Sequence, residues 1–349
     1  MTKIFIILPH NNPSGGTKVA NQVVNLLREK KFASFIVTPE PAQQANFLRE
    51  PAPAVSLNDF SLRVGADDIV ITFWQQREIL EAMKNCPAKK KIFWQHGIII
   101  PRYADFNGEE YFRPGVFTDY WNVSAACADY IKEQYRLPEI KIVHPFFDDE
   151  TLKDFLRTPN DQREGILLLR RRGQEVIPDI ISSFPEQKIT ILPKKFSDAE
   201  LYQALAKHKY FVSTDNGVNG ALLIKNNLHR AFKRVRRFWK NIFAPRAAGQ
   251  IGWVKPKKNL LGFPVTACEA AWLGTTVIAF AMGGGREWMN DENIFLARDG
   301  DVNSLLSKAK EAIDASEEVL QRKKDLASAA VQKFSRENTW QQLKKYLEL

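Results

Sequence analysis

The chain has 349 residues, a length that suits two α/β domains better than a single core. Hydrophobic residues make up 44% and charged residues 26%, a balance that excludes an intrinsically disordered chain. No apolar stretch approaches the roughly 20 residues of a membrane-spanning helix. The three cysteines, Cys86, Cys127 and Cys268, lie far apart without metal-ligand spacing, and no secretory signal opens the chain, so we expect a cytoplasmic protein.

The formal net charge of +10 is concentrated in one segment. Eleven of the 50 basic residues lie between Lys225 and Lys258, where there is no Asp or Glu, so the rest of the chain is close to neutral. A local basic patch of this kind indicates a local anionic partner, which is a lipid surface, a phosphate or a nucleic acid.

Short apolar runs alternate with polar or helical stretches in the first half of the chain. Residues 3–8 predict a buried strand, residues 11–16 a loop, and residues 17–30 a helix with apolar positions on one face. Further strands are predicted at residues 35–38, 69–73, 91–95 and 120–124. This alternation predicts a parallel sheet.

A polar, proline-containing stretch at residues 144–162 is interpreted as a linker, and the alternation then restarts. Ser197 and Glu200 form a capping-box pattern at the start of one predicted helix, and residues 301–349 are expected to be helical. Strands are predicted at residues 165–169, 188–192, 210–213 and 276–280, and helices at residues 174–183, 197–207 and 266–273.

Two glycines, Gly15 and Gly16, join the first predicted strand to the first predicted helix. Glycine has no Cβ atom, so the backbone can approach a ligand, and the amides at a helix N-terminus favour an anion. The pattern is not the G-x-G-x-x-G loop of dinucleotide-binding proteins. A plain tight turn explains the pair equally well, and both interpretations stay open.

A second glycine loop is formed by Gly283, Gly284 and Gly285, after the predicted strand at residues 276–280. A row of exposed amides there would suit a pyrophosphate. A flexible turn is the alternative, which the entropic cost of three glycines disfavours. Glu287 could face the loop or cap backbone amides.

Glu269 lies in an otherwise apolar predicted helix, in the sequence Ala-Cys-Glu-Ala-Ala-Trp. A carboxylate is costly to bury unpaired, so we expect Glu269 to face a site and accept hydrogen bonds from sugar hydroxyls, rather than to be an exposed helix charge. Arg170, Arg171 and Arg172 follow another strand, at the edge where open α/β sheets bind ligands, and could grip a diphosphate or form a solvated turn. His96 also ends a strand, where it could contact substrate or be structural.

The segment Gly262–Asp301, GFPVTACEAAWLGTTVIAFAMGGGREWMNDENIFLARDGD, resembles the nucleotide-sugar signature of family-four retaining glycosyltransferases, the group 1 glycosyl transferases. The usual form of that signature is E-G-F-G-L-P-x-x-E-A, then a small-residue G-T-P-V strand and a glycine loop. The Gly15–Gly16 pair is similar to the family's N-terminal glycine loop, His96 to its strand-end histidine, and Asn122-Val123-Ser124 to its serine-then-helix element.

The resemblance implies an α/β protein of GT-B fold, with two Rossmann-like domains whose parallel sheets face a cleft. It implies an acceptor domain at residues 1–150 and a nucleotide-sugar domain at residues 151–334, which carries a basic amphipathic insertion at residues 218–260. Residues 335–349 would form a C-terminal helix that crosses back to the first domain.

The resemblance also implies roles for individual residues. His96, Arg171 and Glu269 are expected to be catalytic, with Glu269 on the ribose hydroxyls and the arginines offsetting charge on the leaving diphosphate. No metal and no cofactor are expected, because no D-x-D motif lies in a clear site context. Donor binding is expected from Gly15, Gly16, Arg170, Arg172, Gly283, Gly284, Gly285, Arg286 and Glu287.

Two departures from the family pattern stand out. The family's two glutamates are separated by seven residues, and here Leu261 takes the first position while Glu269 takes the second. The family's arginine–lysine pair is replaced by the run Arg170–Arg172, without a clear lysine partner. Which of these arginines faces the site stays open, as does the effect of Leu261 on catalysis.

The basic segment predicts an amphipathic helix that Pro245 ends. Its apolar positions recur at helical spacing and its other positions are mainly basic, which suits an anionic membrane interface. The alternatives are a stripe that faces the protein core, and nucleic-acid binding, for which no motif is present. The residues expected at the membrane are Phe232, Arg236, Arg237, Trp239 and Lys240.

These features together predict a metal-independent, retaining glycosyltransferase of hexosyl or deoxyhexosyl type, with a role in polysaccharide biosynthesis. It would use a nucleoside-diphosphate sugar and a saccharide or lipid-linked acceptor at the inner, cytoplasmic face of a membrane, without nucleic acid. The alternative is a catalytically degenerate GT-B scaffold that binds a saccharide, a nucleotide or a protein. The sugar, the base, the acceptor and the oligomeric state stay open.

Overall fold

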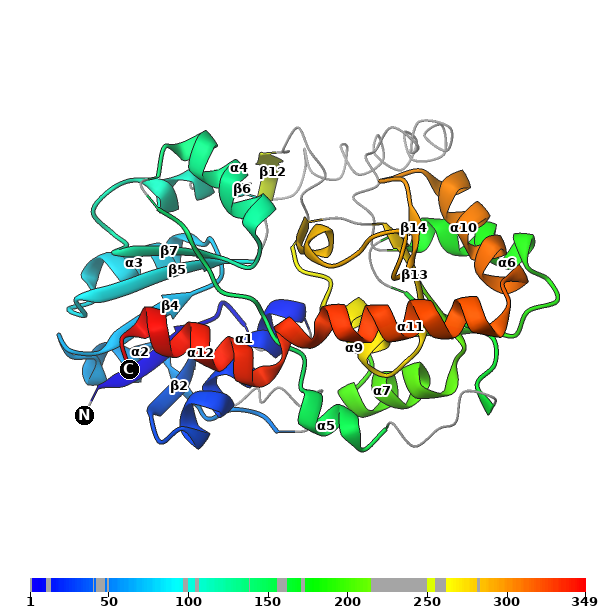
Figure 1. The fold of residues 1–349 in the computed structure, drawn as a ribbon. Helices are drawn as coiled ribbons and strands as arrows, with labels where there is room; N and C mark the ends of the chain where they lie inside the picture. Colours follow the sequence, from blue (N-terminus) through cyan, green and yellow to red (C-terminus); the bar gives the residue numbers. More distant parts are fainter. Residues whose placement is uncertain are drawn as a thin grey trace, which may run out of the picture.

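The computed structural model describes residues 2–10, 14–39, 41, 48, 50–96, 100–103, 107–137, 139–155, 162–170, 173–214, 250–254, 262–280 and 283–349. These residues form two lobes, each built on its own parallel sheet (Figure 1). This arrangement confirms the predicted pair of Rossmann-like units. The predicted domain boundaries after residues 150 and 334 stay predictions.

The N-terminal lobe has a seven-stranded sheet of order β3-β2-β1-β4-β5-β7-β8, with every neighbouring pair parallel. Side chains alternate across β1, so Ile4 and Ile6 belong to one core cluster while Phe5 and Ile7 belong to another. The elements are β1 (Lys3–Ile7), α1 (Gly15–Glu29), β2 (Ala33–Thr38), β3 (Ala54–Ser56), α2 (Leu57–Arg63), β4 (Ile69–Thr72), α3 (Arg77–Asn85), β5 (Lys90–Gln95), a 3-10 turn η1 (Gly108–Phe112), β7 (Asp119–Asn122), α4 (Ala125–Tyr135) and β8 (Lys141–Ile142).

The C-terminal lobe has a five-stranded parallel sheet of order β10-β9-β11-β13-β14, again with a core cluster on each face. The capping box is present, because the Ser197 hydroxyl accepts from the Glu200 amide and the Glu200 carboxylate accepts from the Ser197 amide. The elements are β9 (Ile166–Leu169), η3 (Gln174–Val176), α6 (Ile177–Ser183), β10 (Ile189–Leu192), α7 (Asp198–Lys207), β11 (Tyr210–Ser213), α9 (Val265–Trp272), β13 (Thr276–Phe280), η5 (Gly283–Glu287), β14 (Phe295–Ala297), α10 (Val302–Asp314) and α11 (Glu317–Val331).

The predicted helix at residues 174–183 begins as the 3-10 turn η3 before α6 starts at Ile177. Proline lies in the first turn of α6, where its missing amide costs no helical hydrogen bond. The strands β3, β8 and β14 were not predicted, since they have only two or three residues each.

In the described part of the chain, the backbone links the lobes in three places. The first contains the short helix α5 (Asp149–Lys153). The second runs from α11 through η6 (Gln332–Phe334) into α12 (Arg336–Leu347), which crosses to the N-terminal lobe and places Trp340, Leu343 and Leu347 in the core cluster of β1 (Figure 1). The third is an antiparallel pairing of β6 (Ile100–Tyr103) with β12 (Gln250–Val254). The predicted crossing of the C-terminal helix is therefore confirmed.

Candidate active site between the lobes

The centre of the candidate site is α9, which carries the signature-like sequence. This helix contacts α7, α11 and the strands of the C-terminal sheet, and its residues from Ala267 to Ala271 are buried. Because the helix is enclosed, Glu269 is 0% exposed. A buried carboxylate needs partners, and those partners decide what the site can do.

Glu269 is paired with a residue of the other lobe. Lys18, the fourth residue of α1, places its Nζ 2.7 Å from Glu269 Oε1, and the Tyr202 hydroxyl lies 3.2 Å from the same oxygen. Lys18 also donates to Asp198 Oδ1 at 2.9 Å and to the Tyr202 hydroxyl at 2.9 Å. The second oxygen of Glu269, Oε2, is buried and has no hydrogen-bond partner among the described residues.

Burial and charge act in opposite directions in this network. Burial raises the pKa of the Glu269 carboxyl above its ordinary value, and the charge of Lys18 is the largest influence that lowers it. Burial also disfavours the charged form of Lys18, but Glu269, Tyr202 and Asp198 more than offset it, so the pKa of Lys18 is well above its ordinary value. Lys18 is therefore a fixed cation, and Glu269 depends on it to remain ionised.

The second glycine loop forms η5, a 3-10 turn whose three glycines are buried. The Gly284 amide donates to the Gly262 carbonyl at 3.0 Å, so this amide is engaged inside the protein. A Cβ atom on Gly284 would lie 2.3 Å from the Phe263 ring, and Gly283 has a positive φ of 50°. Glycine is thus required here for the turn to pack against Phe263.

The charged side chains of the two residues after these glycines contact other elements. Arg286 contacts Asp299 at 2.6 Å, beside the C-terminal sheet. Glu287 accepts a hydrogen bond from the Ala125 amide at the start of α4 at 2.7 Å, and its Oε2 lies 2.6 Å from His144 Nε2. Of the two positions foreseen for this carboxylate, the structure has the one that caps backbone amides.

The residues predicted at the N-terminal side lie at the edge that faces the C-terminal lobe. The His96 ring stacks on Phe73 with a centroid distance of 4.3 Å, its Nε2 has no hydrogen-bond partner among the described residues, and burial lowers the pKa of His96 to about 3. The His96 carbonyl would lie 2.4 Å from a Cβ atom on Gly262, so β5 ends against the signature segment. Gly15 and Gly16 form the first turn of α1, one turn before Lys18.

The remaining predicted residues make none of these contacts or lie outside the described residues. Arg170 directly follows β9 and is exposed. The positions outside the described residues are Arg171, Arg172, Leu261, Phe232, Arg236, Arg237, Trp239 and Lys240.

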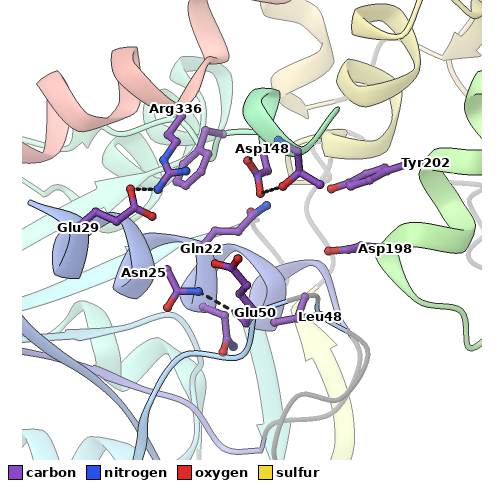
Figure 2. Close-up of a pocket in the computed structure, with 12 residues that line it drawn as sticks. Gln22, Asn25, Glu29, Leu48, Glu50, Asp148, Asp198, Tyr202 and Arg336 are labelled. Carbon is purple, nitrogen blue, oxygen red and sulfur yellow. Dashed lines mark hydrogen bonds and ion pairs between the residues drawn. The ribbon is translucent and has the colours of Figure 1, made fainter. Parts of the chain in front are cut away.

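A polar pocket that the sequence did not reveal lies between the lobes, next to the Lys18 network (Figure 2). Its walls come from α1, α5, α7, the start of α12 and the segment around residues 48–50. Asp198 and Tyr202 belong both to this pocket and to the network. A sequence signal did exist, because Lys18, Gln22 and Asn25 recur at helical spacing and form a polar stripe opposite the apolar face of α1.

No helix among the described residues has the length and apolar composition needed to cross a membrane. No group of three or more His, Cys, Asp or Glu side chains in the same part of the chain could hold a metal ion.

The sequence matches no protein-family model and no curated protein sequence. The fold is similar to a glycosyltransferase from Rickettsia africae, with a TM-score of 0.66 and 15% identity over 99% of this chain and 97% of that one. It is similar to Anabaena HepE in complex with UDP, with a TM-score of 0.65 and 12% identity over 99% and 100% of the two chains. TarM gives a TM-score of 0.68 and 10% identity over 100% and 98% of the chains. The chain therefore has the two-domain GT-B fold that its sequence predicted.

Proposed function

We propose that this protein is a glycosyltransferase that moves a hexosyl or deoxyhexosyl unit from a nucleoside-diphosphate sugar to a saccharide or lipid-linked acceptor. The observation that carries the proposal is the buried carboxylate of Glu269, which has one oxygen free among the described residues and lies where the two lobes meet. A carboxylate oxygen held in this way can accept hydrogen bonds from vicinal hydroxyls, as ribose presents them.

The comparisons support a nucleoside-diphosphate sugar as the donor. HepE has been solved with UDP and with UDP-glucose, and S. aureus TarM with UDP and saccharides, on chains that share this fold. A likeness of 10–15% identity supports the proposal through the fold, while the chemistry rests on Glu269.

The proposed reaction retains the configuration at the anomeric carbon and needs no metal. The bond from that carbon to the diphosphate oxygen breaks, and a bond to the acceptor oxygen forms on the same face of the sugar. The acceptor proton goes to the departing phosphate oxygen. His96 has a pKa of about 3 because it is buried, so it would act in this site as a neutral imidazole that can form hydrogen bonds and not as a cation.

The basic insertion at residues 218–260 is the feature that supports a membrane location in this proposal. Apart from β12, its residues, including all of its basic ones, lie outside the described part of the chain, so membrane contact rests on the charge and periodicity of the sequence. Flotation with anionic vesicles tests this part, and a variant with Arg236, Arg237 and Lys240 changed to Gln should lose binding. Equal flotation of both proteins would contradict it.

A thermal-shift panel of UDP, GDP, dTDP and ADP sugars tests the donor site directly. A ligand that binds only the folded protein raises its apparent stability by mass action, so one nucleotide should stabilise the wild type and fail to stabilise Glu269→Ala. Absence of a shift with every nucleotide would instead favour the non-catalytic scaffold, for which Leu261 is the supporting residue. A product of inverted anomeric configuration would overturn the retaining mechanism.

A further inference from the structure

Lys18 is a single cation that joins the two lobes at the proposed donor site. It comes from α1 of the N-terminal lobe, and all three of its hydrogen-bond partners come from α7 and α9 of the C-terminal lobe. Only 8% of the residue is exposed. A buried ammonium in this place determines the hydrogen bonds of every group that it contacts.

The hydrogen bonds of this network leave one atom of Glu269 unused. The ammonium has three N–H donors, and they are matched by Asp198, the Tyr202 hydroxyl and Glu269 Oε1. The Tyr202 hydroxyl accepts from Lys18 and can therefore donate its own hydrogen to Glu269 Oε1. Oε1 thus accepts twice, while Oε2 is buried and accepts from no described residue.

We propose that Lys18 is a positioning residue for the donor nucleotide: it holds Oε1 of Glu269 so that Oε2 is presented, ionised, to the ribose hydroxyls. The inference rests on the proposed function, because it assigns Lys18 to the same donor site. Lys18 does not touch the nucleotide in this arrangement, and it acts through Glu269. Since Lys18 and Glu269 belong to different lobes, donor affinity becomes sensitive to how closely the lobes approach.

If Lys18 keeps Glu269 ionised, replacing Lys18 should change how nucleotide affinity depends on pH. A lysine with a merely structural role would not have this effect. Among the described residues, the charged or titratable groups that act on Glu269 are Lys18, Asp198, Tyr202 and its neighbour Cys268, and Lys18 is the one cation of this set. Without Lys18, burial and the neighbouring Asp198 both favour the protonated carboxyl. A protonated Glu269 accepts ribose hydrogen bonds more weakly, so nucleotide affinity should then depend on pH.

Isothermal titration calorimetry with UDP tests the inference, with GDP, dTDP or ADP used instead if the thermal-shift panel selects one of them. Lys18→Met should weaken binding about tenfold or more near neutral pH, and Lys18→Arg should restore most of the affinity because it keeps the charge. Lys30→Met is the matched control. It removes a lysine from the end of the same helix, whose ion pair with Glu337 is long at 3.8 Å and exposed, and it should leave the UDP affinity unchanged.

The pH dependence of nucleotide affinity distinguishes a positioning role of Lys18 from a purely structural one. For Lys18→Met, the rise of affinity with pH as Glu269 ionises should lie at higher pH than in the wild type, because loss of the Lys18 charge raises the pKa of Glu269 further. The double variant Lys18→Met/Glu269→Gln has no titrating carboxyl here and should bind weakly without this pH dependence. It also removes the unpaired charge, so it provides a folded protein for the measurement if Lys18→Met does not fold.

The outcomes distinguish this inference from the proposed function. If the wild type binds UDP and Lys18→Met binds it equally well with the same pH profile, the positioning role is wrong and the donor site stands. If the double variant binds as tightly as the wild type, the positioning role is also wrong. If the wild type binds no nucleotide, the proposed function fails and the role of Lys18 fails with it.

Discussion

Two glutamates of the signature segment make contrasting contacts with the N-terminal lobe. Glu269 on α9 is 0% exposed, and only one of its oxygens is bonded within the described residues. The side chain of Glu287 at the end of η5 is 17% exposed, and both of its oxygens are bonded, one to the Ala125 amide and one to His144.

The difference indicates which carboxylate is available to a ligand. The Gln342 side-chain nitrogen lies 3.1 Å from His144 Nδ1, and His144 Nε2 lies 2.6 Å from Glu287 Oε2. Glu287 therefore belongs to a chain of hydrogen bonds from α4 through His144 to α12, and it joins the lobes. Glu269 also joins the lobes, but its Oε2 accepts from no described residue, so of the two carboxylates it is the better candidate to bind the proposed donor.

Among the variants that test the difference between Glu269 and Glu287, Lys18→Met is expected to lose the most unfolding free energy. Removing one partner of a buried ion pair leaves the other charge uncompensated, which typically costs about 3–5 kcal/mol of unfolding free energy. Urea denaturation of the purified variant measures the loss. Lys30→Met, in the same helix, should change the free energy by less than about 0.5 kcal/mol because its ion pair is exposed. Equal losses of unfolding free energy in Lys18→Met and Lys30→Met would contradict the expected difference between a buried and an exposed ion pair.

The double variant sharpens the result. In Lys18→Met/Glu269→Gln the uncompensated carboxylate is gone, so the unfolding free energy should recover by roughly 1–3 kcal/mol relative to Lys18→Met. Additive losses from the two substitutions would mean that Lys18 and Glu269 do not act as a pair.

The next effect in size concerns His96, a partly buried titratable group with no carboxylate partner among the interactions described above. Its pKa of about 3 lies below the ordinary value of 6.5, so the unfolded chain takes up a proton first as the pH falls. The stability linked to His96 is therefore present above pH 6.5 and is lost as the pH falls from there towards 3, by roughly 2 kcal/mol at pH 5.

His96→Phe tests this prediction. Its unfolding free energy should fall less than that of the wild type between about pH 7 and about pH 5, because the variant has no imidazole to protonate. Urea denaturation at several pH values measures the difference. Parallel pH profiles for the two proteins would show that His96 does not titrate as its burial requires.

A smaller effect is expected from Glu287→Gln. The substitution keeps the shape of the side chain but removes a charge from the N-terminus of α4 and from the contact with His144, at a cost of about 1–2 kcal/mol. Glu78→Gln is the matched control, since Glu78 is exposed in the first turn of α3. If both variants lose equal stability in urea, the contact of Glu287 with the other lobe contributes nothing beyond an ordinary helix charge.

The strands that the sequence predicted correctly are those with strong local signals. Each predicted strand is present within about one or two residues of its expected limits, because burial on both faces of a parallel sheet requires short apolar runs. The capping box at Ser197 is equally local and is also present. The pairing of β6 with β12 has no local signal, since it joins segments about 150 residues apart.

The pairing of Glu269 with Lys18 could not be predicted from the sequence either, because it also joins residues that are far apart along the chain. The sequence indicated that a carboxylate in an apolar helix needs a partner, and a ligand was the partner expected. The structure adds Lys18, which is 251 residues away along the chain. Helical periodicity places Lys18 on the polar face of α1, but only the packing of the two lobes brings it to Glu269.

The smallest expected effect on stability is that of Gly15→Ala. A Cβ atom at Gly15 meets no heavy atom within 4 Å, so the substitution should leave stability unchanged or raise it by up to about 1 kcal/mol through helix propensity. At Gly16 a Cβ atom would lie 2.5 Å from the Trp74 ring, so Gly16→Ala should lose stability and is the matched contrast.

Nucleotide binding then separates the two explanations of this glycine pair. Packing against Trp74 accounts for Gly16 without any ligand, whereas nothing among the described residues accounts for Gly15. If the donor or acceptor approaches the start of α1, Gly15→Ala should bind its ligand more weakly while remaining as stable as the wild type. Unchanged affinity of this variant for both substrates would mean that Gly15 and Gly16 form only a tight turn. Glu269 would then be better supported as a ligand-binding residue than the start of α1.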